Sequence, residues 1–172
     1  MSALNIDPAL LENNQKLQLW HKNFAKPFAI YLQLERGLSS NTLDAYMRDV
    51  DKLLNFYMED NIEPTKATID NLHDFVVALY DIGLDARSQA RILSGVRAFY
   101  KFLLLENIIE VDPCELLSSP KIGMHLPEVL SVEEIDMIEN AIRLDTREGQ
   151  RNKAIIEVLY SCGLRVSELC NL

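Results

Sequence analysis

Apolar residues recur along this chain at the three- and four-residue spacing of an α-helix, and no run alternates apolar and polar residues as a half-buried strand does. Because Gly, Pro, Asn and Ser fall between the periodic stretches, the pattern divides into separate helices. The sequence therefore predicts an all-α fold. With 172 residues, 48% of them hydrophobic, the chain can bury a core in one ordinary domain or in two small ones.

Helix start and stop signals place several helices in the first two thirds of the chain. A polar lead is expected to end before a first helix at residues 24–35, with Gly37 after its end. A second helix is expected after Ser39 or Ser40, and a third after Thr68, because these side chains can cap a helix. The remaining expectations are Gly83 just past the third helix, a fourth helix over residues 86–106 and a short fifth helix opened by Asp112 and Pro113.

The helical periodicity is interrupted at residues 118–130 by Pro120, Gly123 and Pro127, which predicts a linker. Beyond it, Ser131 and Glu134 fit a capping box at the start of a helix that is expected to run to about Leu144. A further helix is expected at residues 151–161, stopped by Gly163, and another from Val166 onward. The predicted organisation is an N-terminal extension at 1–22, a helical domain at 23–117, a linker at 118–130 and an incomplete second domain at 131–172.

The formal charge of −9 argues against a protein that binds nucleic acid through its bulk charge. Basic residues are nevertheless concentrated, because residues 86–105 contain four of them and no acidic residue. No stretch approaches the roughly 20 apolar residues of a membrane span, and the N-terminus lacks a signal-peptide pattern. We therefore expect a cytoplasmic protein with no membrane segment.

The three cysteines have neither disulfide nor metal-ligand spacing, and each has apolar neighbours. Cys114, Cys162 and Cys170 are therefore expected to be small core residues. The sequence predicts no metal site and no cofactor.

One face of the helix expected at residues 86–106 combines basic and small side chains. A helix in a DNA groove needs long basic side chains that reach phosphates or base edges, and small residues that let its backbone approach. The alternative is a solvated helix surface, which usually carries acidic residues four positions from the basic ones, and none is present. On a helical wheel the face spans about 120° and contains Arg97, Ala90, Lys101, Ser94, Arg87, Ala98 and Arg91, whereas the rest is apolar apart from Gln89.

The start of the helix that follows Ser39 or Ser40 is also polar, with Asn41 and Thr42 preceding Tyr46. Hydroxyl, amide and backbone N–H groups at a helix start can bind a phosphate. The same residues are ordinary helix caps, and Tyr46 lies on the apolar stripe of this helix. Both interpretations stay open at this point.

Four segments, in their order and spacing, resemble the Xer family of tyrosine site-specific recombinases, within the phage-integrase class. Together they cover nearly the whole chain, from Phe24 to Leu172. The segments are LERGLSSNTLDAY at residues 34–46, RILSGVRAFYKFL at 91–103, Asp112-Pro113 with Ser119-Pro120-Lys121 and Leu126-Pro127, and RNKA at 151–154 leading to LYSCGLRVSEL at 159–169.

The resemblance implies a SAM-like core-binding domain at residues 23–117, which grips one face of a DNA duplex, followed by the first helices of a catalytic domain. It implies that Asn41, Thr42 and Tyr46 approach phosphates or base edges and that Lys121 lies on a linker crossing the DNA backbone. The basic residues implied to face DNA are Arg87, Arg91, Arg97 and Lys101.

The resemblance also gives Arg165 a role, as the first arginine of the family's active site. Arg165 would clamp an oxygen of the scissile phosphate, and Glu168, one turn on, would brace it. In the family a tyrosine hydroxyl attacks this phosphate and forms a 3′-phosphotyrosyl link. That tyrosine and the other catalytic residues lie downstream of the position of Arg165. The chain therefore resembles a recombinase truncated after its first catalytic arginine and is predicted to be inactive in strand cleavage by itself.

The implied parent protein binds a short, partly palindromic duplex as a dimer and acts as a tetramer on two sites. Chromosome-dimer resolution is the task that the resemblance favours, with mobile-element integration as an alternative. Two other classes stay open, a non-catalytic DNA-binding regulator and a helical protein–protein interaction module. The incomplete second domain also predicts self-association through its apolar faces.

Overall fold

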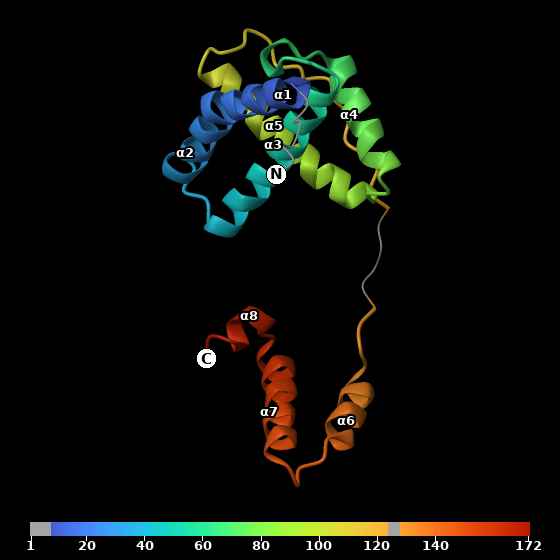
Figure 1. Ribbon diagram of the computed structural model, residues 1–172. Helices are drawn as coiled ribbons and strands as arrows, with labels where there is room; N and C mark the ends of the chain where they lie inside the picture. Colours follow the sequence, from blue (N-terminus) through green and yellow to red (C-terminus); the bar gives the residue numbers. More distant parts are fainter. Residues whose placement is uncertain (1–7, 124–127) are drawn as a thin grey trace, which may run out of the picture. The chain divides into compact units, whose positions relative to one another are not determined.

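The computed structural model describes residues 8–123 and 128–172, which are helical with no strand among them. The chain divides into two compact units, Met1–Gly123 and Met124–Leu172, which are described separately below (Figure 1). No helix among the described residues is long and apolar enough to cross a membrane. The same residues contain no group of three or more His, Cys, Asp and Glu side chains placed to hold a metal ion.

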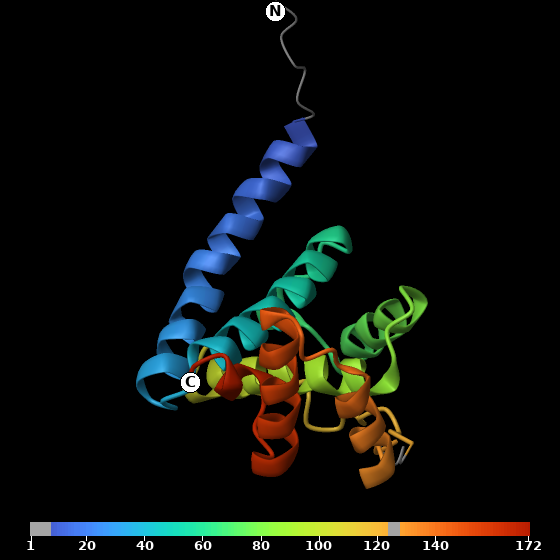
Figure 2. The ribbon, with the colours of Figure 1, turned by 90° about the horizontal axis from the view of Figure 1, so that it is seen from below.

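The first unit begins with a helical run much longer than predicted. Its first helix starts at Pro8 rather than at Phe24, and it passes without a break through a π-helical turn into the next helix (Figure 2). The prediction missed this run because most of it is polar and lacks an apolar stripe. Trp20, which is buried, and Leu17 pack it onto the core. The helices are α1 (Pro8–Trp20), the π turn (His21–Ala25), α2 (Lys26–Leu34), α3 (Ser40–Glu59), α4 (Ile69–Asp81) and α5 (Ala86–Leu105), with a 3₁₀ turn at Pro64–Lys66.

The core of this unit is built around α3 and α5. Phe28 of α2 packs against Phe99 and Phe102 of α5, with ring centroids 5.5 Å apart in both pairs. The hydroxyl of Tyr57 on α3 lies 2.8 Å from that of Tyr100 on α5, and Tyr100 donates to the carbonyl of Pro64. This core leaves the opposite side of α5 facing outward.

Local signals set most helix ends as predicted. Ser39 caps α3 by accepting from the backbone N–H of Thr42, and Thr68 caps α4 in a capping box with Asn71. The left-handed residue after α4 is Gly83, at φ +80°. The cap of α5 is Asp85, which sequence reasoning did not identify; Gly37, as expected, has a positive φ after α2.

The prediction of a short helix opened by Asp112 and Pro113 is wrong. The segment forms a turn instead, because the carboxylate of Asp112 accepts from the backbone N–H of Cys114, as in an Asx turn. Leu117 then buries its side chain, and the chain runs on without helical structure to Gly123. A local turn and the burial of Leu117 therefore set the conformation of this segment.

The second unit contains α6 (Val132–Ala141), α7 (Arg147–Cys162) and α8 (Val166–Leu169). Its capping box at Ser131 and the left-handed stop at Gly163 are confirmed. The helix α6 is three residues shorter than predicted, and α7 starts earlier because Thr146 caps it. The prediction of three core cysteines is wrong in part: Cys114 in the first unit is buried, but Cys162 and Cys170 are exposed, since this unit encloses no core around them.

Candidate nucleic-acid interface

The outward side of α5 carries the basic and small residues that the helical wheel grouped together. Ile92, Val96 and Phe99 on the opposite side are buried, as predicted. On the outward side Arg87, Arg91, Ser94 and Lys101 are exposed, and Arg97, Ala90 and Ala98 are half-buried. We call these seven residues of α5 the basic strip.

Two shallow hollows lie along the basic strip, and α3 contributes to both. The first, here the Asn41 hollow, has a volume of about 310 Å³ and the second, here the Lys101 hollow, about 260 Å³. Tyr46 lines both, so the start of α3 and the basic strip form one continuous surface. The Asn41 hollow is lined by Asn41, Thr42, Ala45, Tyr46, Asp49, Arg91 and Ser94, and the Lys101 hollow by Tyr31, Leu32, Arg36, Leu38, Tyr46, Arg97, Ala98 and Lys101.

Tyr46 combines the two interpretations that the sequence left open. Its half-buried ring meets the buried ring of Phe28 edge to face, with centroids 6.5 Å apart, and it also borders both hollows. Near the same helix start, the Thr42 hydroxyl lies 2.9 Å from that of the cap Ser39, whereas Asn41 is exposed in the first turn. Capping and an accessible polar helix start therefore occur together.

Arg91 is held by an acidic residue of the neighbouring helix. Its two terminal nitrogens donate to the two carboxylate oxygens of Asp49, at 2.9 and 2.8 Å. Burial raises the pKa of the Asp49 carboxyl, and the hydrogen bonds and charge of Arg91 oppose this rise. Sequence reasoning missed this pair because it examined acidic residues on α5 only, and Asp49 belongs to α3.

Arg97 has a structural contact as well as a place on the strip. One of its terminal nitrogens donates to the carbonyl of Leu117, at 2.8 Å, and so ties the segment after Pro113 to α5. An arginine has five N–H donors, so most of those on Arg97 remain for other partners. Lys101, one turn further along, is exposed.

Two predicted site residues, Arg87 and Lys121, lie outside both hollows. Arg87 is exposed in the first turn of α5, and Lys121 is exposed in the segment after Pro120. Arg36, between α2 and α3, and Ser94 of the basic strip line the hollows but were not predicted as site residues. The signal for Arg36 was its place beside the helix stop Gly37 in the first motif.

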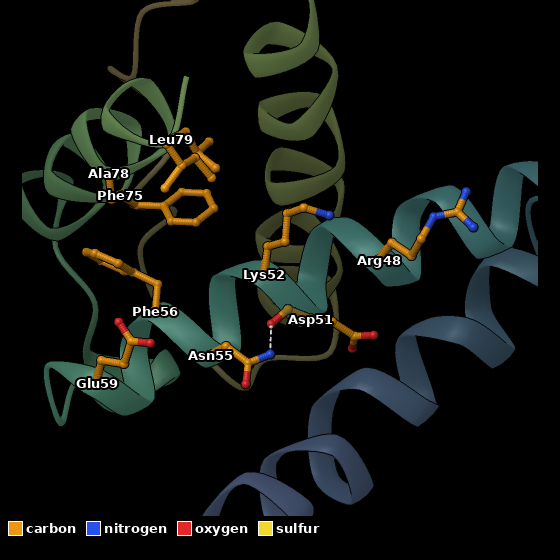
Figure 3. A pocket seen from close by; sticks show the side chains of 10 residues that line it. Arg48, Asp51, Lys52, Asn55, Phe56, Glu59, Phe75, Ala78 and Leu79 are labelled. Atoms are coloured by element: carbon orange, nitrogen blue, oxygen red, sulfur yellow. Dashed lines mark hydrogen bonds between the residues drawn. The ribbon is translucent and has the colours of Figure 1, made fainter. Parts of the chain in front are cut away.

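A larger depression of about 420 Å³ lies between α3 and α4 and gathers none of the predicted site residues (Figure 3). Its apolar wall is formed by Phe56 and Phe75, whose ring centroids are 5.4 Å apart, and by Leu79. Arg48 and Lys52 of α3 also line this depression (Figure 3).

In the second unit, Arg165 and Glu168 form a compact pair. Arg165 is the N-cap of α8; its backbone N–H donates to one carboxylate oxygen of Glu168 at 2.7 Å, and its guanidinium donates to the other at 3.0 Å. The Arg165 side chain is 82% exposed. These two hydrogen bonds are the contacts that a bracing role for Glu168 would use. The other N–H donors of the Arg165 guanidinium are accessible to solvent.

Comparisons with known proteins identify the class to which this architecture belongs. Residues 25–107 match the family model of the phage integrase N-terminal SAM-like domain. The tyrosine recombinase XerD of Chlorobaculum tepidum is 38% identical over 156 residues, 89% of this chain and 51% of the relative. XerD of Proteus mirabilis is 41% identical over 81% of this chain and 44% of the relative, and XerC of Anoxybacillus flavithermus is 36% identical over 84% and 49%.

The chain therefore contains a phage integrase N-terminal SAM-like domain, and more than four fifths of its length is similar to tyrosine recombinases. More narrowly, the relatives just described all carry the name XerC or XerD. The chain spans about half the length of these curated relatives. The α1 helix and the first four residues of the π turn precede the matched domain, which starts at Ala25.

Proposed function

We propose that residues 23–117 form the DNA-binding domain of a site-specific tyrosine recombinase, which breaks and rejoins DNA through a 3′-phosphotyrosyl intermediate. The observation that carries this proposal is the basic strip of α5, which lies outward beside the polar start of α3 in a chain that is otherwise acidic. A net charge of −9 repels DNA overall, so a local cationic surface must supply the attraction.

The strip and the two hollows divide the DNA contacts by chemistry. Arg97, Lys101 and Arg36 surround the Lys101 hollow and suit phosphate oxygens. The Asn41 hollow offers an amide, hydroxyls and an arginine, which suit base edges or a phosphate. The proposed contact set is Asn41, Thr42, Tyr46, Arg87, Arg91, Arg97, Lys101 and Lys121, and we add Arg36 because it lines the Lys101 hollow.

For the second unit we propose that Arg165 clamps the scissile phosphate and that Glu168 holds its guanidinium in place. No tyrosine follows Arg165 in this sequence, and in the family the nucleophile comes after this arginine. We therefore expect the 172-residue chain alone to form no covalent adduct with a nicked duplex. A protein–DNA band that survives denaturation and disappears after protease treatment would contradict this expectation.

The cellular task proposed for the whole protein is chromosome-dimer resolution in the cytoplasm, with mobile-element integration as the alternative. The names of the relatives support a Xer-type role. In this proposal a dimer occupies one partly palindromic site and a tetramer joins two sites. A non-catalytic regulator with the same fold would bind such sites without exchanging strands.

Reversing two charges of the basic strip tests the proposal directly. The double change Arg97→Glu and Lys101→Glu should weaken duplex binding by roughly a hundredfold at moderate salt, because two phosphate contacts become repulsive. Fluorescence anisotropy at several salt concentrations measures this, and the salt dependence should become shallower.

A matched control makes the same change in charge elsewhere. Lys22→Glu with Lys66→Glu also replaces two cations by two anions. Lys22 lies in the π turn before α2, and Lys66 lies two residues after Pro64, whose carbonyl accepts from Tyr100 on the core side of α5. Neither lysine lines the Asn41 hollow or the Lys101 hollow. Equal losses for the two double variants would show that binding depends on bulk charge and not on the basic strip.

A further inference from the structure

The ion pair between Asp49 and Arg91 lies where the Asn41 hollow crosses from α3 to α5. The Asp49 side chain is only 3% exposed, whereas that of Arg91 is 52% exposed. Both carboxylate oxygens are occupied by the two terminal nitrogens of the guanidinium. The carboxylate is thus almost fully covered, while the more exposed Arg91 lines the open hollow.

Gly95 determines how closely Asp49 can approach α5. A Cβ at Gly95 would lie 2.7 Å from a carboxylate oxygen of Asp49 and 2.8 Å from its Cβ. The carboxylate therefore occupies the space beside Gly95, one helical turn after Arg91, where any side chain would collide with it. This close packing fixes the position of the carboxylate that accepts both hydrogen bonds from Arg91.

The bidentate pairing leaves a usable part of Arg91 unoccupied. A guanidinium has five N–H donors, and Asp49 uses one on each terminal nitrogen. The donors on Nε and on the adjacent terminal nitrogen form a second fork along the side edge. A fork of this kind matches two neighbouring acceptors, such as O6 and N7 of guanine in the major groove.

Neither stability nor phosphate attraction accounts well for this pair. Burial raises the pKa of Asp49 despite the nearby Arg91, so keeping this carboxylate charged is unfavourable for folding. The charges also cancel locally, so Arg91 adds little to the field that draws phosphates. The pair does provide a fixed hydrogen-bonding edge at the surface.

We propose that Asp49 is a positioning residue that makes Arg91 a reader of base edges rather than a phosphate contact. This inference rests on the proposed DNA-binding function. It assigns two tasks to one strip: Arg91 discriminates between base pairs, with guanine as the expected partner, while Arg97 and Lys101 supply salt-dependent affinity. Asp49 acts only through Arg91 and touches no DNA.

The test starts with a random duplex pool, from which the wild-type 172-residue chain selects its preferred sequences. Affinities for a selected duplex and for a scrambled duplex of the same composition are then measured for wild type and for Asp49→Asn. Asparagine keeps the shape of the side chain but cannot accept both hydrogen bonds from Arg91. We expect the ratio of the two affinities to fall roughly tenfold or more, while affinity for the scrambled duplex rises because a negative charge is removed.

Two further variants separate positioning from folding. Arg91→Lys keeps the positive charge but has no planar fork, so its affinity ratio should fall as well. Glu63→Gln neutralises a carboxylate paired with Lys66 at the loop beside Pro64, and it should keep the wild-type ratio. Thermal unfolding of each variant establishes whether it is folded. If Asp49→Asn does not fold, the affinity ratio of Arg91→Lys is used in its place.

The possible outcomes distinguish failure of the positioning role of Asp49 from failure of the proposed DNA-binding function. If folded Asp49→Asn keeps the wild-type affinity ratio, or if wild type binds duplex DNA without selecting any sequence, the positioning role is overturned and DNA binding stands. If wild type shows no salt-dependent binding to any duplex, the proposed function fails and the inference fails with it.

Discussion

The first unit packs its helices around a core that encloses Phe28, Phe99 and Tyr57 completely, whereas the second unit buries a single described residue, Gly149. Both units have well-capped helices. Capping and intrinsic propensity stabilise a short helix only marginally, and tertiary packing supplies most of its stability. The comparison therefore separates helices stabilised by a core from helices defined mainly by local signals.

The same contrast applies to the two candidate sites. In the first unit, Arg91 is held by the buried Asp49, and Arg97 is tied to the backbone of Leu117. In the second, the acidic partner of Arg165 among the described residues is Glu168, three positions later in α8, and the side chains are 82% and 46% exposed. The first unit thus presents basic side chains held by contacts between different segments, whereas Arg165 is held by a neighbour close in sequence.

The largest expected difference between the units comes from removing an aromatic side chain in each. Phe99→Ala should lower the free energy of unfolding of the first unit by about 3–5 kcal/mol, because a fully buried ring leaves a cavity. Tyr160→Ala, at a half-exposed position of α7 in the second unit, should change the free energy of unfolding of the first unit by less than about 0.5 kcal/mol. Urea unfolding followed by the fluorescence of Trp20, the only tryptophan, reports on the first unit alone. Similar losses for both variants would break the contrast.

A glycine in each unit offers a second comparison. Gly95→Ala should destabilise the first unit by about 1–3 kcal/mol, because its Cβ would push against Asp49 and force α3 away from α5. In Gly149→Ala the Cβ would meet the backbone oxygen of Arg143, so the loop before α7 must move. That movement should leave the urea transition seen by Trp20 unchanged. A higher transition midpoint for Gly95→Ala would show that the α3–α5 contact is looser than described.

High pH should destabilise the first unit specifically. Burial raises the pKa of Tyr57 and of Tyr100 above the usual value of about 10. Between the unfolded and folded pKa values the folded state keeps protons that the unfolded state releases, so stability falls as pH rises above about 10, by roughly 1.4 kcal/mol per pH unit for each tyrosine. Urea unfolding at several alkaline pH values measures the slope. Tyr57→Phe should make it shallower, and an unchanged slope would count against the buried hydroxyl pair.

Sequence reasoning succeeded where structure depends on neighbours within a few positions. Thr68 and Ser131 were identified as caps because a cap contacts residues two or three positions later. Gly83 and Gly163 were identified as stops because a left-handed residue suits glycine. The two faces of α5 followed from helical periodicity alone.

Sequence reasoning failed where the structure depends on contacts between segments that are distant in the sequence. The polar α1 helix is attached to the core by Trp20 near its end, which no periodic pattern reveals. The candidate site shows the same limit: the basic strip was predicted, but its partner Asp49 and the neighbouring Arg36 come from other segments. Their relation to the strip exists only after α2, α3 and α5 have packed together.

The smallest expected effect comes from one capping residue in each unit, and it tests whether the units are independent. Thr68→Ala removes the cap of α4 and should lower the free energy of unfolding of the first unit by about 0.5–2 kcal/mol, since α4 packs on its core through Leu72 and Phe75. Ser131→Ala removes an equivalent capping box from α6, none of whose residues is buried. It should leave the Trp20 transition unchanged and speed hydrogen exchange at the amides of α6. If Ser131→Ala also shifts the Trp20 transition, the second unit is coupled to the first, and its helices are stabilised by more than their local signals.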